Sequence, residues 1–141
     1  MDCRNSAGSI GNRNIKIKIR LKRLVILGGG ESGAGAAVLA MQKGFDVFVS
    51  DQGSIAKKYK EALLESHIDF EEHKHTEAKI LNATIVVKSP GIPDSVPLIV
   101  KLKKNGVKVI SEIEFAAAYT DATIIGITGS NGKTTTALLT H

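Results

Sequence analysis

Hydrophobic and polar positions follow one repeating order along this chain: a short apolar run, then a longer stretch with apolar residues on one side. The run 24–27 is wholly apolar, and in the following stretch, 32–43, Ala, Leu and Met recur at helical spacing. This order repeats as far as residue 119. It predicts strands at 24–27, 45–49, 69–72, 84–88 and 107–110, and helices at 32–43, 55–66, 76–81, 97–105 and 112–119.

Regular alternation of strands and helices is typical of an α/β protein with a parallel sheet. We therefore expect a Rossmann-like sheet with flanking helices over residues 22–120. A further β-branched run at 122–127 predicts the first strand of a second domain, so 121–141 is interpreted as the start of a truncated ATPase domain.

The composition indicates a globular protein, with 43% hydrophobic and 23% charged residues among 141. No apolar run approaches the roughly 20 residues of a membrane span, so no membrane association is expected. The single cysteine, Cys3, cannot form an internal disulfide, which favours the reducing cytoplasm.

The net charge of +5 is concentrated at the N-terminus. Residues 1–23 hold seven Lys or Arg against one Asp, whereas the remainder holds twelve basic against thirteen acidic residues. The predicted domain therefore has no basic excess, and nucleic-acid binding is rejected as its main function. Residues 1–21 are expected to be an extension that is disordered or adds an edge strand.

A glycine-rich loop follows the first predicted strand directly. Gly28–Gly33 matches the pattern G-x-G-x-x-G, and Asp51 ends the second predicted strand 21 residues beyond Gly30. In this setting the loop and the helix N-terminus bind a diphosphate, and the acidic residue is placed for a ribose hydroxyl. The pattern predicts a nucleotide-diphosphate site, for which NAD is one candidate ligand.

A second glycine loop lies at 126–136, between the predicted strand at 122–127 and a predicted helix over 134–141. Strand, glycine turn, Lys133-Thr134 and helix form the arrangement of a P-loop. Lys133 would supply a mobile positive charge to phosphates, and Thr134 would be a ligand of Mg²⁺. A hydride-transfer enzyme has no use for such an ATP site, which makes NAD the less favoured ligand of the first loop.

Together the two loops resemble the Mur ligases of bacterial cell-wall synthesis, over about residues 22–141. The resemblance depends on four segments: 28–33, Ser89-Pro-Gly-Ile92, Ser111-Glu-Ile-Glu114 and Gly129-Ser-Asn-Gly-Lys-Thr-Thr135. The Ser-Pro-Gly segment after a strand points to the branch that adds D-glutamate. Gly126 stands one place before the first glycine of a standard P-loop, an offset that the family shares.

The resemblance implies a role for each matching position. A UDP-linked substrate would meet Gly30, Glu31, Ser32, Gly33, Asp51, Gln52, Ser89, Pro90 and Gly91. ATP would be held by Gly129, Ser130, Asn131, Gly132, Lys133, Thr134 and Thr135, with Thr134 on Mg²⁺ and with Lys133 and Thr134 as the catalytic residues.

The reaction that the resemblance implies begins with transfer of the γ-phosphoryl group of ATP to the carboxylate of UDP-N-acetylmuramoyl-L-alanine. The amine of D-glutamate then attacks the acyl phosphate. The family's later metal ligands and its D-glutamate domain would lie beyond His141, so we expect this chain alone to be inactive as a ligase. A monomer is expected.

Two other functions remain open at this point. One is an NAD-binding oxidoreductase domain, and the other is a stand-alone nucleotide-binding module. A metal site at His67, His73 and His75 is rejected, because no further ligand recurs near them at a suitable spacing and charged residues surround them.

Overall fold

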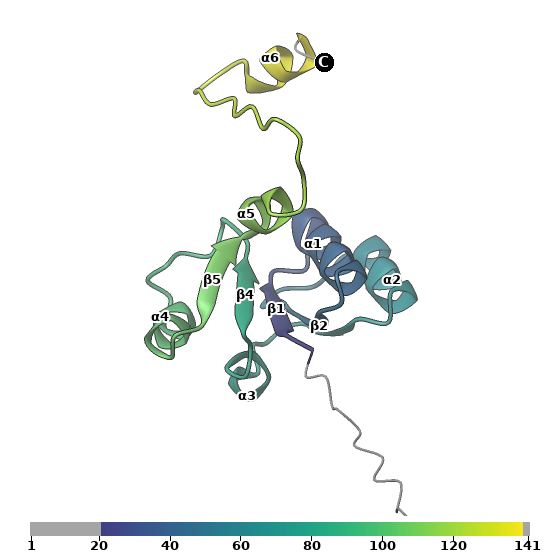
Figure 1. Cartoon of the computed structure of the whole chain (residues 1–141), viewed down its shortest axis with the longest axis vertical. Coiled ribbons are helices and arrows are strands. Elements are labelled where there is room, and N and C mark those ends of the chain that lie inside the picture. The colour runs from purple at the N-terminus through teal and green to yellow at the C-terminus, as the bar shows by residue number, and fades with distance from the viewer. Residues whose placement is uncertain (1–20, 140–141) are drawn as a thin grey trace, which may run out of the picture.

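A computed structural model describes residues 21–139. The five strands form one parallel sheet in the order β3-β2-β1-β4-β5, as the alternating pattern predicts (Figure 1). The strands are β1 (Arg23–Leu27), β2 (Asp46–Ser50), β3 (Asp69–Glu71), β4 (Ile85–Lys88) and β5 (Lys108–Ser111). The predicted extension over 1–21 falls almost wholly outside the described residues.

Six helices lie within the described residues. They are α1 (Glu31–Gln42), α2 (Lys57–Glu65), α3 (Glu77–Ile80), α4 (Pro97–Lys104), α5 (Glu112–Ala117) and α6 (Lys133–Leu139). Each agrees with a predicted helix to within a few residues. None of them is both long and apolar enough to cross a bilayer.

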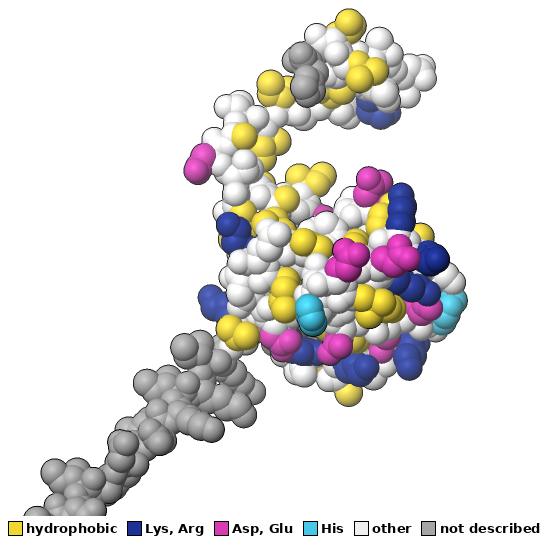
Figure 2. All heavy atoms as spheres, turned by 90° about the vertical axis from the view of Figure 1, so that its right-hand side faces the viewer, with side chains coloured by type: hydrophobic (Ala, Val, Ile, Leu, Met, Phe, Trp, Pro, Cys, Tyr) yellow, Lys and Arg dark blue, Asp and Glu magenta, His cyan; other side chains and the backbone are white. Residues whose placement is uncertain are grey.

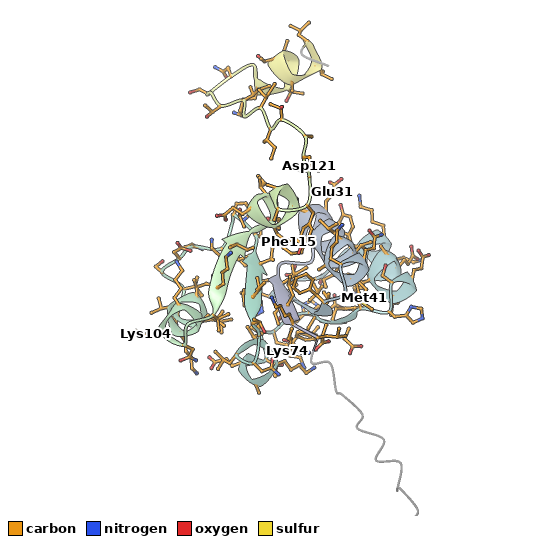
Figure 3. All side chains as sticks on the ribbon, in the orientation of Figure 1. Glu31, Met41, Lys74, Lys104, Phe115 and Asp121 are labelled. Atoms are coloured by element: carbon orange, nitrogen blue, oxygen red, sulfur yellow. The ribbon has the colours of Figure 1, made fainter. Side chains whose placement is uncertain are left out.

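The core consists of two apolar layers, one on each face of the sheet. Leu24 and Ile26 of β1 contribute to the layer beneath α1, α2 and α5, while Val25 and Leu27 contribute to the layer beneath α3 and α4. Alternate side chains of a strand point to opposite faces, so a strand covered on both sides is apolar throughout. Figure 3 shows Phe115 extending from α5 into the first layer.

The segment 122–127 is not a strand in the structure, and this prediction was wrong. A strand requires a hydrogen-bonded neighbour, and none of the five described strands pairs with this segment. Ile124 and Ile125 are 61% and 71% exposed, and Figure 2 shows hydrophobic side chains on the surface of the segment that leads to α6. The β-branched composition alone does not produce a strand here.

Candidate nucleotide-binding site

The loops after β1 and β4 and the start of α5, which directly follows β5, meet at the carboxyl edge of the sheet. The three strands are neighbours in the order β1-β4-β5, so the residues that follow them lie side by side. Ser89 donates its backbone N–H to the carbonyl of Leu27 over 3.0 Å, which joins the start of the Ser-Pro-Gly loop to the end of β1. Ligands of open α/β sheets bind at this edge.

Two glycines shape the loop between β1 and α1. Gly28 has a φ of +110°, a conformation that favours glycine, and its N–H donates to the carbonyl of Ser50 over 2.9 Å. A Cβ at Gly33 would lie 1.9 Å from the carbonyl oxygen of Gly28. Only glycine at position 33 lets α1 begin this close to the loop.

A pocket of about 220 Å³ opens between these loops. It is lined by Gly28, Gly30, Glu31, Ser32, Gly33, Ser89, Pro90, Glu112 and Ile113. Six of the nine predicted substrate-binding positions therefore share one pocket. Figure 3 shows Glu31 at the N-terminal end of α1, close to α5. The first turn of α1, with its unpaired N–H groups, forms one wall, which suits an anionic group.

Gly91, Asp51 and Gln52 do not line this pocket. The carboxylate of Asp51 instead accepts hydrogen bonds from the backbone N–H groups of Gly29, over 2.5 Å, and of Gly53, over 2.7 Å. Asp51 thus joins the turn after β2 to the glycine loop after β1. The sequence pattern places it near the loop, but its backbone partners become visible only in the fold.

Lys88, at the end of β4, braces the Ser-Pro-Gly loop. Its ammonium donates to the carbonyl oxygen of Ile92 over 2.8 Å and lies 3.4 Å from the carboxylate of Asp94. Asp94 also pairs with Lys103 of α4 over 2.9 Å, and the two lysines hold the pKa of Asp94 below its usual range. The loop that forms the far wall of the pocket is therefore anchored at both ends.

Glu112 is a pocket residue to which the sequence reasoning gave no role, although it lies in the segment 111–114 that resembles the Mur ligases. It is the first residue of α5 and is only 7% exposed, and burial raises the pKa of its carboxyl group. A signal was available, because Glu112 directly follows the fifth strand at the ligand-binding edge. Its neighbour Ser111 caps α5 in a capping box with Glu114.

Behind the site, a polar cluster lies where β2 and β3 end. The carboxylate of Glu71 accepts hydrogen bonds from the hydroxyl of Ser50 and from both the N–H and the hydroxyl of Thr76, at 2.7 to 2.8 Å. Burial alone would raise the pKa of Glu71, but these hydrogen bonds and the charge of Lys79 hold it below its usual range.

His75 belongs to this cluster, because its Nδ1 lies 2.7 Å from the hydroxyl oxygen of Ser50. His75 is half-buried, whereas His67 and His73 are exposed. The described residues contain no group of three or more His, Cys, Asp or Glu side chains that could hold a metal ion.

The second glycine loop lies at the start of α6, away from α1 and the sheet (Figure 1). Gly129 and Gly132 have φ angles of +154° and +76°, and the ammonium of Lys133 donates to the carbonyl oxygen of Gly129 over 2.6 Å. The cationic side chain thus folds back over its own loop. A loop of this kind fits a phosphate group, because it places a positive charge beside glycine-rich backbone.

Residues 22–111 match the profile of the family described as Mur ligase MurD-like, N-terminal domain. The chain is 60% identical over 121 residues to the UDP-N-acetylmuramoylalanine--D-glutamate ligase of Christiangramia forsetii, and 64% identical over 121 residues to that of Bacteroides thetaiotaomicron. These alignments cover 85% and 86% of this chain. The chain spans about a quarter of the relatives' length, 27% in both cases.

Solved structures resemble the same part of the molecule. A murein peptide ligase from Psychrobacter arcticus matches 82% of this chain with a TM-score of 0.66 and 25% identity, and the match covers 24% of that protein. A pseudomurein peptide ligase type C from Methanothermus fervidus matches with a TM-score of 0.60 and 29% identity, over 82% of this chain and 24% of that protein.

Proposed function

This chain belongs to the MurD-like Mur ligases, and from that premise we propose that it is the N-terminal part of an ATP-dependent ligase that adds D-glutamate to UDP-N-acetylmuramoyl-L-alanine. The whole enzyme would act in the cytoplasm in peptidoglycan synthesis. Within it, residues 22–120 would bind the UDP-linked substrate, and residues from 121 onward would begin the ATP-binding domain.

The observation that supports this proposal most directly is the pocket between the two substrate loops. Gly30, Ser32 and Gly33 line one side and Ser89 and Pro90 the other, and these positions come from separate segments of the sequence. A diphosphate in this pocket would face the N–H groups at the start of α1, where the helix dipole favours negative charge. Asp51, by holding Gly29, would keep the loop in a shape that admits the diphosphate.

ATP would be held by the loop 129–135. Lys133 would exchange its present contact with the carbonyl of Gly129 for contacts with phosphate oxygens, and Thr134 would hold Mg²⁺ through its hydroxyl. ATP supplies the phosphoryl group that activates the substrate carboxylate. The chain's own residues would position that group and neutralise its charge, which is the main task in phosphoryl transfer.

Calorimetric titration of the 141-residue chain with UDP-N-acetylglucosamine, UDP and NAD tests the first site. The uridine ligands should bind and NAD should not. Ser32→Trp should abolish the binding by filling the pocket, while Ser66→Trp, a substitution in the turn after α2, serves as the matched control. Binding of NAD in preference to both uridine ligands would contradict the proposal and favour an oxidoreductase domain.

A further inference from the structure

Glu112 places an acidic group at a pocket that is otherwise suited to an anion. Glu112 lines the same pocket as Gly30 and Gly33, and it lies beside Ser89, because the residues before them, Ser111 and Lys88, are register partners of β5 and β4. It also lines a neighbouring, mainly apolar pocket of about 300 Å³ together with Ser32, Leu39 and Ile113, so it stands where the two pockets join. A ligand that fills the first pocket must therefore approach this carboxyl group.

Glu112 forms no ion pair within residues 21–139. Lys88 is the one base whose charge lowers its pKa, and this ammonium is already shared between the carbonyl of Ile92 and the carboxylate of Asp94. The backbone N–H of Glu112 itself lowers this pKa more than Lys88 does, but burial outweighs both and the pKa is raised.

The charged groups on the surrounding elements do not change this balance. Acidic groups face Glu112 from α1, the loop after β4 and α5: Glu31, Asp94 and Glu114. Each nearby lysine already interacts with one of them: Lys58 with Glu31, Lys88 and Lys103 with Asp94, and Lys108 with Glu114. A diphosphate would therefore add negative charge to a group of residues whose lysines are already paired.

We propose that Glu112 takes up one proton from solvent when the diphosphate of the substrate binds, so that substrate binding and protonation of this carboxyl group are coupled. The inference rests on the proposed function of the pocket. A buried carboxylate beside an incoming anion is disfavoured both by lost hydration and by repulsion, whereas the neutral acid can donate a hydrogen bond to a phosphate oxygen. Burial, which already raises the pKa of Glu112 in the free protein, acts in the same direction.

The coupling between ligand binding and proton binding determines how the affinity changes with pH. If the complex binds one more proton than the free protein, affinity must rise as the pH falls, by up to about tenfold per pH unit in the range between the two pKa values. A suitable ligand is UDP-N-acetylglucosamine, because both of its phosphates are esterified. UDP itself is unsuitable, since its terminal phosphate titrates at about pH 6.

The test is calorimetry of the 141-residue chain with UDP-N-acetylglucosamine at pH 6, 7 and 8, in buffers with different ionisation enthalpies. We expect each binding event to take up nearly one proton. The affinity should be at least about tenfold higher at pH 6 than at pH 8. Glu112→Gln should bind at least as tightly at pH 8 and should lose both the proton uptake and the pH dependence. Glu31→Gln removes another charge from the same pocket, and in this variant the proton uptake should persist.

Each contrary result has a distinct meaning. Binding without proton uptake, or weaker binding by Glu112→Gln, would show that the ionised carboxylate accepts a hydrogen bond from the ligand, and would overturn the inference alone. If binding requires Mg²⁺ and is lost in Glu112→Gln, the carboxylate holds a metal ion instead of taking up a proton, and the inference is overturned. Absence of binding at every pH in both proteins would remove the proposed pocket function as well.

Discussion

The carboxylate of Asp51 accepts a hydrogen bond from the backbone N–H of Gly29, and this contact joins the turn after β2 to the glycine loop after β1. Its other oxygen accepts from Gly53, so one side chain holds two turns at the ligand-binding edge. Asp51, the residue that follows β2, is therefore part of the structure of the glycine loop.

Replacement of Asp51 should loosen that edge. Asp51→Ala removes both hydrogen bonds, and the free energy of unfolding should fall by about 2 kcal/mol, the range for hydrogen bonds to a charged acceptor. Asp51→Asn keeps the size of the side chain and one acceptor oxygen, so its free energy of unfolding should fall by less. Urea denaturation of the three proteins measures the difference. Equal stability of all three would mean that the contact with Gly29 contributes nothing.

The close approach at Gly33 predicts a large difference between two glycines of the same helix. Gly33→Ala places a methyl group against the carbonyl of Gly28, and should lower the free energy of unfolding by about 3 kcal/mol or displace the loop. Gly35→Ala meets no atom within 4 Å and should raise stability by about 0.5–1 kcal/mol, because alanine is the better helix former. Thermal unfolding of both variants is the measurement, and similar shifts in Tm would contradict the predicted packing.

The polar cluster at Glu71 predicts a dependence of stability on pH. Its pKa in the folded protein lies below the ordinary value of 4.5, so its contribution is present above that pH and is lost as the pH falls through the folded pKa. Glu71→Gln should therefore cost about 2 kcal/mol at pH 7 and less at about pH 3.5. Denaturant titrations at both pH values measure this. The exposed residue Glu65 offers the control, since Glu65→Gln should change little at either pH.

The two glycine loops should divide their work in the full-length ligase. Lys133→Ala should lower the rate by about a hundredfold or more, because a preorganised positive charge on the transferring phosphoryl group is lost. Binding of the UDP-linked substrate should hardly change. Ser32→Trp should do the reverse, weakening substrate binding while sparing ATP binding. Steady-state kinetics with titration of each nucleotide measures the division, and loss of substrate binding in Lys133→Ala would reverse the assigned roles.

The sequence by itself determined the order of the elements and the parallel sheet. Apolar runs such as 24–27 are continuous because both faces of the strand are covered, and helical stretches such as 32–43 show a one-sided pattern, so local spacing suffices to distinguish them. These inferences depend on periodicity and chain order, which are properties of the sequence. The assignment of the segments 28–33 and 89–91 to one substrate site came instead from the resemblance to the Mur ligases, and Ser89 and Pro90 share a pocket with Gly30 and Gly33.

Only the tertiary structure decided which side chains face the pocket and which brace it. Asp51 turns to backbone N–H groups, Lys88 holds the loop of Ile92, and Glu112 is buried at the junction of two pockets, because each depends on atoms brought together from distant segments. The run 122–127 likewise shows that local sequence alone does not determine the structure. Its β-branched residues favour a strand, but a strand forms only where a neighbouring strand completes its hydrogen bonds, and the described part of the chain provides none.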